Sequence, residues 1–267
     1  MSKVRLQKDL EELVNKSGCI PLIREQFMSE EEIHKRIAKS NLEEEFCFDL
    51  LVQMALHKRC NLPTLVGLLR RHFDNAQLCA NALEVAMNAD LVDYDPSLKV
   101  FITIATVSKE IQSQIDQYQY PLPMLVEPKE LTENSHTGYL VYQYGSVLLR
   151  DNHHEDDVCL DHLNRMNKVK LCIDTRTATM IKNNWRNLDK PKEGELLQEY
   201  RKRVKAFEKY DRTSKNVIDL LVQEGNEFYL THAYDKRGRI YCKGYHVSYQ
   251  GTAWNKAVIE FSEKEYI

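Results

Sequence analysis

Apolar residues in the first third of the chain recur at spacings that predict helices. From Phe46 to Leu56 they follow the pattern of a buried helical face. Two further helices are predicted over Thr64–Phe73 and Ala76–Asn88, with a turn between them. Capping boxes, in which a helix-starting side chain is followed three residues later by an acid, are predicted at Ser29 with Glu32 and at Asn41 with Glu44.

The segment LVDYDPSLKVFITI predicts a β-hairpin, because two short apolar runs flank Asp95-Pro96-Ser97. Helix, turn, helix and hairpin are also the outline of a winged-helix DNA-binding domain. The second helix, Ala76–Asn88, has almost no basic or bidentate side chains with which to read bases. A packing role for this helix is therefore favoured over a DNA-reading one.

Prolines mark a boundary after the N-terminal helices, at Pro121, Pro123 and Pro128. The next segment, TGYLVYQYGSVLLRD, predicts a hairpin that turns at Gln143-Tyr144-Gly145. Helices are then predicted over Asp157–Val169, Thr175–Asn187, Glu193–Phe207 and Thr213–Glu224, with Gly225 as the C-terminal cap of the last.

The composition is that of an ordinary soluble globular protein, with 43% hydrophobic and 29% charged residues in a chain of 267. The net charge of −3 means that any nucleic-acid site must be a local patch. The chain shows neither an apolar signal core nor the run of about 18 apolar residues that a membrane span needs. Seven scattered cysteines without a CxxC pair indicate reduced thiols and an intracellular protein.

The acidic segment Asp151–Asp161 contains His153 and His154, so one interpretation is a metal site. The other is a solvated loop that leads into a helix, whose first turn favours acids. The second is preferred, because adjacent histidines rarely converge on one ion. We predict no metal site in this chain.

The stretch from Arg201 to Lys215 has seven basic residues and two acidic ones, a local balance of +5. Such a patch attracts phosphate backbones, because each neutralised phosphate releases counterions. A solvated helix face with internal ion pairs is the alternative. The candidate nucleic-acid-binding residues here are Arg201, Arg203, Lys205 and Lys215.

A second basic feature lies near the C-terminal end. Phe228-Tyr229-Leu230 predicts a strand, the DKRG sequence from Asp235 a turn, and Arg239-Ile240-Tyr241-Cys242 the returning strand. The turn would present Lys236, Arg237 and Arg239 among several tyrosines. Cations hold phosphates and aromatic faces stack on bases, although many basic hairpins with aromatic packing bind no nucleic acid.

Motifs of a self-sufficient enzyme are absent from the sequence. It contains no GxxxxGK[ST], GxGxxG, GxSxG or HExxH pattern. No pair of aspartates in a strand context near the hairpin could hold two metals. An enzyme complete within this chain is therefore not expected.

The run DKRGRIY from Asp235 to Tyr241 resembles the [T/D]xxGR element of the phage-type single-subunit RNA polymerases, a family that also includes mitochondrial enzymes. Other segments resemble the family in the same order. PMLVEPKELTENSHTGYL is similar to its boundary segment, LDHLNRMNKVKLCID to one of its helices, and Ser248-Tyr249-Gln250-Gly251 to its Pro-Gln-Gly segment. The resemblance covers about Tyr120–Phe261, and the residues before it match only in being helical.

Two positions depart from the family pattern, where Tyr249 replaces a proline and Leu131 a tryptophan. The family continues for hundreds of residues beyond this point, through a palm with two metal-binding aspartates and fingers with a lysine and a tyrosine that handle the nucleotide. The resemblance therefore implies the smaller subunit of a heterodimeric, split phage RNA polymerase. A fragment of one longer polymerase is the alternative.

The resemblance also implies partners and a place of action. The expected partners are a second subunit with palm and fingers, template DNA, nascent RNA and ribonucleoside triphosphates. Magnesium is expected on the partner subunit, where two metal ions would activate the 3′ hydroxyl and stabilise the leaving pyrophosphate. The expected location is the cytoplasm of an infected bacterial host.

Roles for individual residues follow from the same resemblance. Arg239 is expected to contact the template strand or the backbone of the RNA–DNA hybrid, and Gly238 to let the backbone approach it closely. Asp235 is expected to hold the turn, and Tyr241 to lie near the hybrid or the first template base. Nucleic-acid contacts are also expected for Lys236, Arg237, Gln250, Gly251 and the basic stretch.

The expected fold is α+β and mainly α: the helical N-terminal domain of a phage-type RNA polymerase and the first β-hairpin of the palm. The expected parts are a helical domain (1–120), an extended boundary segment with a hairpin (121–150), a helical region with the basic stretch (151–226) and the start of the palm (227–267). The expected function is that of a DNA-directed RNA polymerase subunit, inactive alone, that binds template and hybrid beside an active site completed by its partner. The alternative is a stand-alone, winged-helix-like DNA-binding transcription regulator.

Overall fold

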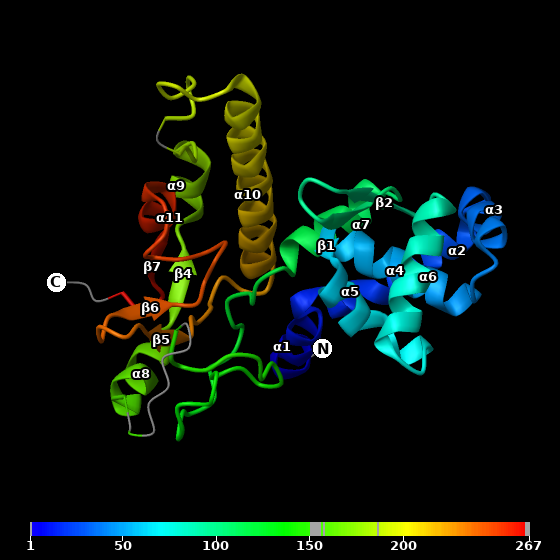
Figure 1. The fold of residues 1–267 in the computed structure, drawn as a ribbon. Coiled ribbons are helices and arrows are strands. Elements are labelled where there is room, and N and C mark those ends of the chain that lie inside the picture. The colour runs from blue at the N-terminus through cyan, green and yellow to red at the C-terminus, as the bar shows by residue number, and fades with distance from the viewer. Residues whose placement is uncertain (1, 150–155, 157, 186, 265–267) are drawn as a thin grey trace. The chain divides into compact units, whose positions relative to one another are not determined.

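The computed structural model describes residues 2–149, 156, 158–185 and 187–264 (Figure 1). The chain divides into two compact units, unit 1 formed by Met1–Asn15 with Asp116–Ile267 and unit 2 by Lys16–Ile115. Helices dominate and the sheets are small, so the predicted α+β, mainly α class is confirmed. None of the helices in the described ranges combines the length and apolar character that crossing a membrane requires.

Unit 2 places a helical cluster against a three-stranded sheet. Its helices are α2 (Ile20–Ser29), α3 (Glu31–Ser40), α4 (Glu44–His57), α5 (Leu62–Leu69) and α6 (Ala76–Asn88), and α7 (Lys109–Gln117) begins in unit 2 and ends in unit 1. Short 3₁₀ turns cover Val14–Cys19 and Arg70–His72. The strands are β1 (Arg59–Asn61), β2 (Val92–Asp95) and β3 (Val100–Thr103).

The sheet of unit 2 is antiparallel with strand order β1-β3-β2, and Phe101 of β3 lies opposite Cys60 on one side and Tyr94 on the other. The predicted hairpin of β2 and β3 is confirmed. Strand β1 was not predicted, since three residues are too short for a periodic pattern. The succession α5, α6, β2, β3 agrees with the predicted outline of helix, turn, helix and hairpin.

Helix α4 is the centre of the unit 2 core. Nearly all its residues from Phe46 to Leu56 are buried, so the predicted helix is confirmed, but it is enclosed on all sides and not along one face. Its buried acidic residue, Asp49, accepts hydrogen bonds from Arg24, Arg71 and His72. A buried carboxylate needs hydrogen-bond donors around it, because burial disfavours its charge.

The two predicted capping boxes are wrong. Ser29 is the last residue of α2, and its hydroxyl donates to the carbonyl of Gln26. Asn41 ends α3 in a left-handed conformation with φ of 54°. Asparagine is common both at the N-cap of a helix and just after a helix C-terminus. Its short polar side chain can cap a following helix, and it also tolerates the left-handed conformation that ends a preceding one.

Unit 1 is built around two small sheets. Its helices are α1 (Lys3–Glu12), α8 (Leu160–Asn167), α9 (Thr175–Met180), α10 (Leu197–Gln223) and α11 (Ala253–Val258). Its strands are β4 (Leu171–Ile173), β5 (His232–Tyr234), β6 (Ile240–Cys242) and β7 (Ile259–Phe261), paired antiparallel as β4 with β7 and β5 with β6. Buried Val217, Leu221, Phe228 and Trp254 belong to the core between these elements.

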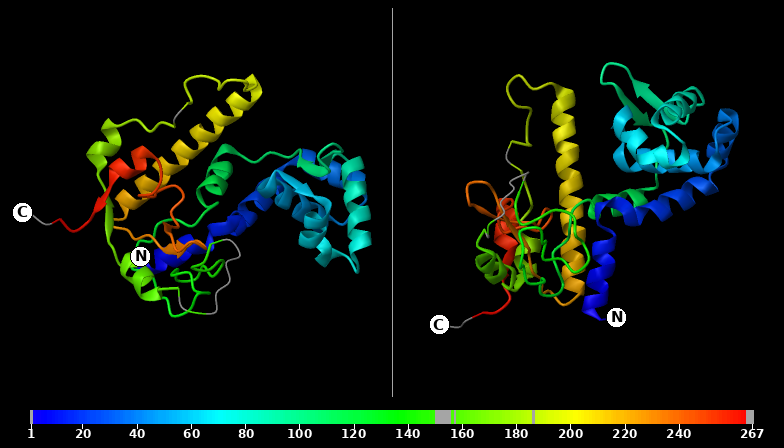
Figure 2. Two further views of the ribbon diagram at one scale, coloured as in Figure 1. Left: turned by 60° about the vertical axis from the view of Figure 1, so that its left-hand side comes forward. Right: turned by 60° about the horizontal axis from the view of Figure 1, so that its bottom comes forward.

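Helix α10 corrects the prediction of two helices over this stretch, because it continues unbroken for 27 residues (Figure 2). The residues between the two predicted helices include no glycine or proline that would interrupt it. Gly225 follows its C-terminus with φ of 104°, as predicted. Helix α9 is shorter than predicted, and it begins at the cap Asp174, whose carboxylate accepts from Arg176 and Thr177.

The hairpin predicted around Gln143-Tyr144-Gly145 is wrong, because residues 121–149 form no strand and only Met124 and Leu148 make isolated β-bridges. The buried carboxylate of Glu11 accepts backbone N–H groups of Leu140, Val141 and Tyr142 at 3.0, 2.6 and 3.0 Å. A side chain from a distant helix thus satisfies donors that a partner strand would otherwise satisfy.

Candidate nucleic-acid interface

The hairpin of β5 and β6 carries the basic turn that the sequence singled out. Tyr234 pairs with Ile240, so residues 235–239 form the connection. The first strand lies closer to the turn than predicted, because Phe228 and Tyr229 form only isolated bridges, to Leu171 and Met124. The turn itself lies where it was predicted.

Asp235 organises this turn with both carboxylate oxygens. Oδ1 accepts the backbone N–H groups of Arg237 and Arg239 at 2.9 and 3.0 Å. Oδ2 accepts the Nε and Nη2 groups of Arg237 at 3.0 and 2.7 Å. Partial burial opposes the charge of Asp235, but these hydrogen bonds outweigh it and lower its pKa to about 2. The turn is therefore braced by a carboxylate that stays ionised near neutral pH.

Gly238 occupies the one position in the turn with a left-handed backbone, at φ of 73°. Its N–H donates to the carbonyl of Asp235 at 3.0 Å. No atom lies within 4 Å of the place where a Cβ would stand, so the requirement for glycine is conformational and not steric.

The cations of the turn differ in their surroundings. All three cations of the turn are exposed, but only the Arg237 guanidinium is paired with Asp235. The hydroxyl of Tyr241 lies 3.4 Å from Oδ2 of Asp235, which places the tyrosine beside the braced turn. The turn and the strand after it thus contain six of the predicted residues: Asp235, Lys236, Arg237, Gly238, Arg239 and Tyr241.

Gln250 and Gly251 lie in the segment behind the hairpin. The amide of Gln250 bonds the backbone of β6 twice, accepting from Cys242 N–H at 2.9 Å and donating to Ile240 carbonyl at 3.1 Å. Gly251 donates to the carbonyl of Ser248 at 2.8 Å, and a Cβ there would lie 3.0 Å from that oxygen. Gln250 therefore braces the hairpin from behind, whereas Gly251 completes the turn of its own segment.

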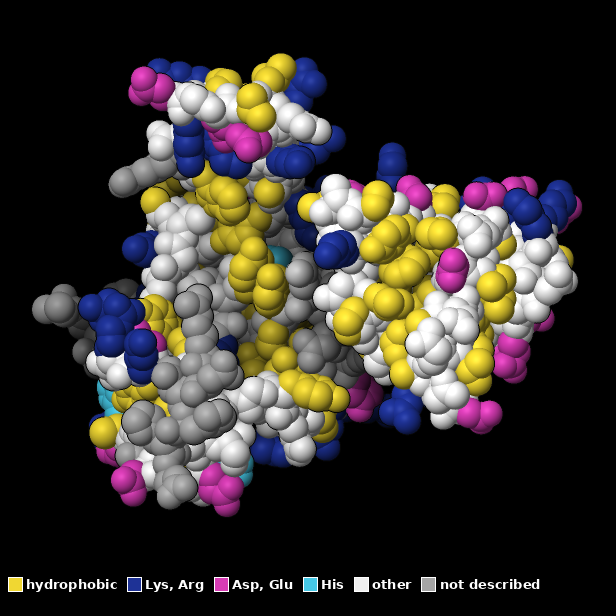
Figure 3. All heavy atoms as spheres, viewed as in Figure 1, with side chains coloured by type: hydrophobic (Ala, Val, Ile, Leu, Met, Phe, Trp, Pro, Cys, Tyr) yellow, Lys and Arg dark blue, Asp and Glu magenta, His cyan; other side chains and the backbone are white. Residues whose placement is uncertain are grey.

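The basic stretch lies on α10, and its predicted residues have different partners. Arg203 forms a bidentate ion pair with Glu195, at 2.6 and 2.8 Å, and the side-chain hydrogen bonds of Arg203 lower the pKa of Glu195 to about 2. Lys215 pairs with Asp211 at 2.7 Å. Arg201 and Lys205 are exposed. Figure 3 shows lysine and arginine side chains gathered over the upper part of α10 and, separately, over the turn of the hairpin.

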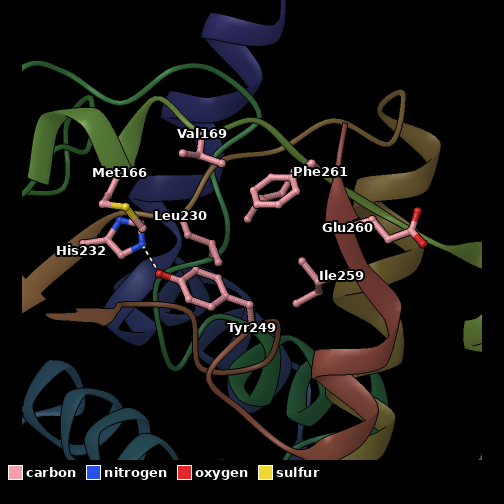
Figure 4. Close-up of a pocket in the computed structure, with 9 residues that line it drawn as sticks. Met166, Val169, Leu230, His232, Tyr249, Ile259, Glu260 and Phe261 are labelled. Atoms are coloured by element: carbon pink, nitrogen blue, oxygen red, sulfur yellow. Dashed lines mark hydrogen bonds between the residues drawn. The ribbon is translucent and has the colours of Figure 1, made fainter. Parts of the chain in front are cut away.

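An apolar cavity of about 350 Å³ lies beside the hairpin (Figure 4). Val169, Leu230 and Ile259 contribute apolar walls, and the Nε2 atom of His232 lies 2.7 Å from the hydroxyl of Tyr249. Burial lowers the pKa of His232 to about 4, so the imidazole is neutral near pH 7. This cavity could not be predicted from the sequence, because its walls come from four separate segments.

Lys243, which follows β6, is a further group that sequence reasoning missed. Its ammonium donates to the carbonyl of Ser146 at 2.7 Å, and burial lowers its pKa to about 8. A lysine directly after a short strand carries no sequence signal of burial.

Metal ligation finds no support among the described side chains, because no three His, Cys, Asp or Glu residues converge in those ranges. His153 and His154, the residues of the alternative metal interpretation, lie outside the described residues.

Comparison with known proteins gives one distant relative. No protein-family model matches the chain. A protein of Agaricus bitorquis described as a probable DNA-directed RNA polymerase is 29% identical over 202 residues, which cover 65% of this chain. The match spans 18% of the length of that relative. This partial similarity supports a distant relationship between the chain and RNA polymerases.

Proposed function

We propose that this chain is a subunit of a DNA-directed RNA polymerase of the phage type, split so that a partner subunit carries the metal-binding aspartates. The observation that carries the proposal is the braced DKRGR turn, found in a chain that is distantly similar to an RNA polymerase. Bound to its partner, the chain holds template DNA and the RNA–DNA hybrid beside the active site.

The geometry of the turn supports contact with a nucleic-acid backbone. Asp235 neutralises Arg237 and fixes the backbone N–H of Arg239, so the Arg239 side chain starts from a defined position. A guanidinium remains charged and can bind phosphate oxygens in pairs, which suits this position to a phosphate of the template or hybrid. Lys236 adds a second exposed cation.

Exposed apolar surface near β7 supports docking of the proposed partner. Phe261 is 67% exposed and lines the cavity beside the hairpin. The palm of the second subunit is the proposed occupant, because the matched relative is far longer than this chain. We expect an interface of more than ~2,000 Å² in total, as in obligate complexes.

Magnesium belongs to the partner in this proposal. The described residues of this chain offer no cluster of carboxylates that would fit the ion, so no step is assigned to a metal held here. The chain's own contribution is to bind and orient the template and the hybrid, with ribonucleoside triphosphates entering on the partner.

Primer extension tests the proposal. The partner to test is the polypeptide of the same genome that carries the two aspartates, and the template is a primed DNA with all four ribonucleoside triphosphates and magnesium. The expected result is no extension by either polypeptide alone and extension by the mixture. Extension by this chain alone, or failure of the two polypeptides to associate, contradicts the proposal.

A second candidate function rests on the winged-helix order of unit 2, which would make the chain a DNA-binding regulator. Leu78 and Val85 lie exposed on α6, the helix that would read bases, and no lysine or arginine occurs in it. Gel shifts distinguish the candidates. Tight, sequence-selective binding of duplex DNA by the chain alone favours the regulator, and weak, salt-sensitive binding favours the polymerase subunit.

A further inference from the structure

A basic stripe runs along one face of α10. It consists of Lys202, Lys205, Lys209 and Arg212, all exposed. Their spacing of three, four and three residues places them on the same side of the helix. Ten residues of helix span ~15 Å, about the length of four stacked nucleotides at ~3.4 Å each.

The C-terminal part of this stripe is fixed by a buried acid. Asp116 accepts from Lys209 at 2.7 Å and lies 3.4 Å from Arg212. One carboxylate between two half-exposed cations leaves a net positive charge at the surface and sets the direction of both side chains.

An aromatic platform lies beside these cations. The ring of Tyr245 stacks on Tyr120, with centroids 3.9 Å apart and planes at 24°. Tyr210 and His246 contact the same ring nearly at right angles, at 5.9 and 4.9 Å. Tyr245 nevertheless remains 46% exposed.

The platform and the stripe are connected through α10 and the segment after α7. Tyr210, which contacts Tyr245, follows Lys209 directly, and Tyr120 is four residues beyond Asp116. The ring of Tyr245 is thus held by Tyr120, Tyr210 and His246. His246 in turn interacts electrostatically with Lys209 and Asp116, which links the platform to the stripe.

From this arrangement we infer that Tyr245 stacks on an unpaired base of a single strand whose phosphates follow the stripe of Lys202, Lys205, Lys209 and Arg212. The inference rests on the proposed function in taking nucleic acid as the ligand, and it adds a single-strand site away from the DKRGR turn. A single strand is required, because a base within a duplex cannot offer its face to a protein ring. DNA and RNA share this chemistry, so both are tested.

The test is fluorescence anisotropy of the full chain with 5′-labelled twelve-nucleotide oligo(dT) and oligo(U), across a series of salt concentrations. Tyr245→Leu is expected to weaken binding at least ~5-fold, and Tyr245→Phe to retain it, because the stacking face remains. Lys205→Gln is expected to lower the slope of log K against log salt by ~0.7, a change that Tyr245→Leu does not produce.

The control is Lys35→Gln, which removes the same charge from an exposed lysine of α3 that pairs with Glu31 at 3.0 Å and lies outside the stripe. It should leave the slope unchanged. Equal binding by Tyr245→Leu and wild type, an equal loss of slope in Lys35→Gln, or equally tight binding of a duplex of the same length overturns the inference. Single-strand binding without partner-dependent extension refutes the proposed function alone, whereas extension without single-strand binding refutes this inference alone.

Discussion

Within the hairpin turn, Oδ2 of Asp235 accepts two hydrogen bonds from the guanidinium of Arg237, one from Nε and one from Nη2. The same aspartate accepts the backbone N–H of Arg239 but not its guanidinium. Arg237 and Arg239 therefore differ, although only one residue separates them. The side chain of Arg237 helps to hold the turn, whereas the side chain of Arg239 extends from it.

The first prediction concerns these two arginines. Under the proposed function, Arg239→Ala should reduce partner-dependent primer extension at least ~10-fold, because one charged contact contributes about 1.5–3 kcal/mol. The melting temperature should stay unchanged, because the side chain is exposed. Arg239→Lys should retain part of the activity, since it keeps the charge and loses only the paired geometry.

Arg237→Ala is the comparison for that experiment. It removes the side-chain partner of Asp235, so faster amide exchange at Gly238 and Arg239 is expected. If Arg239→Ala extends primers normally, or if only Arg237→Ala reduces extension, the assignment of the two arginines is reversed.

The second prediction separates two glycines near the site. Gly238→Ala should cost about 1–2 kcal/mol, because alanine must adopt φ of 73° although its Cβ meets nothing. Gly244→Ala should cost about 3 kcal/mol or more, because a Cβ there would lie 2.0 Å from the carbonyl oxygen of Val247. Urea unfolding followed by tryptophan fluorescence measures both, and equal costs would contradict the distinction between conformational and steric need.

The third prediction concerns the brace behind the hairpin. Gln250→Leu should speed amide exchange of Cys242, whose N–H loses its acceptor. Gln250→Glu keeps an oxygen at that position, although it loses the bond to the carbonyl of Ile240. Protection of Cys242 should therefore survive in the glutamate variant, and equal exchange in both variants would show that the side chain does not brace β6.

Local chemistry explains which parts of this fold could be predicted. Helix α6 has the predicted bounds, because Asn75 caps it and the apolar spacing within it is regular. The basic turn has its predicted place, because aspartate and glycine define it within four residues. Strands β4 and β7 could not be predicted, since each has three residues and they pair across more than eighty intervening positions.

In the site, too, the positions of residues along the chain could be predicted, but their side-chain partners could not. The sequence placed Arg237 and Arg239 in one basic turn, but nothing in it distinguishes the arginine that Asp235 holds from the other. The pairing of Asp116 with Lys209 joins segments more than ninety residues apart, and the boundary prolines lie between them. Side-chain partners of this kind depend on the folded arrangement and leave no periodic signal.

The fourth prediction is a loss of stability of unit 1 in mild acid. Burial lowers the pKa of both His232 and His246 to about 4, and nearby His162 lowers that of His232 further, whereas Lys209 lowers and Asp116 raises that of His246. In the unfolded chain a histidine takes up a proton below about pH 6.5. Between pH 6.5 and 4 the unfolded state therefore binds more protons than the folded state, so stability falls as the pH falls through this window.

Over this whole window each histidine lowers the free energy of unfolding by about 3 kcal/mol. Below pH 4 these two groups should cause no further change in stability. Asp235 and Glu195 have pKa values of about 2 in the folded chain, lowered from 3.8 and 4.5, so their contributions begin to fall only near pH 4.5. The range from pH 6.5 to 4.5 therefore reports mainly on the histidines. Both tryptophans, Trp185 and Trp254, belong to unit 1, so urea unfolding followed by their fluorescence reports on this unit.

His246→Phe keeps a ring among Tyr120, Tyr210 and Tyr245 and should remove about half of the pH dependence. A stability that stays constant from pH 6.5 to 4.5, or a His246→Phe variant with an unchanged pH dependence, would show that these imidazoles are protonated in the folded chain.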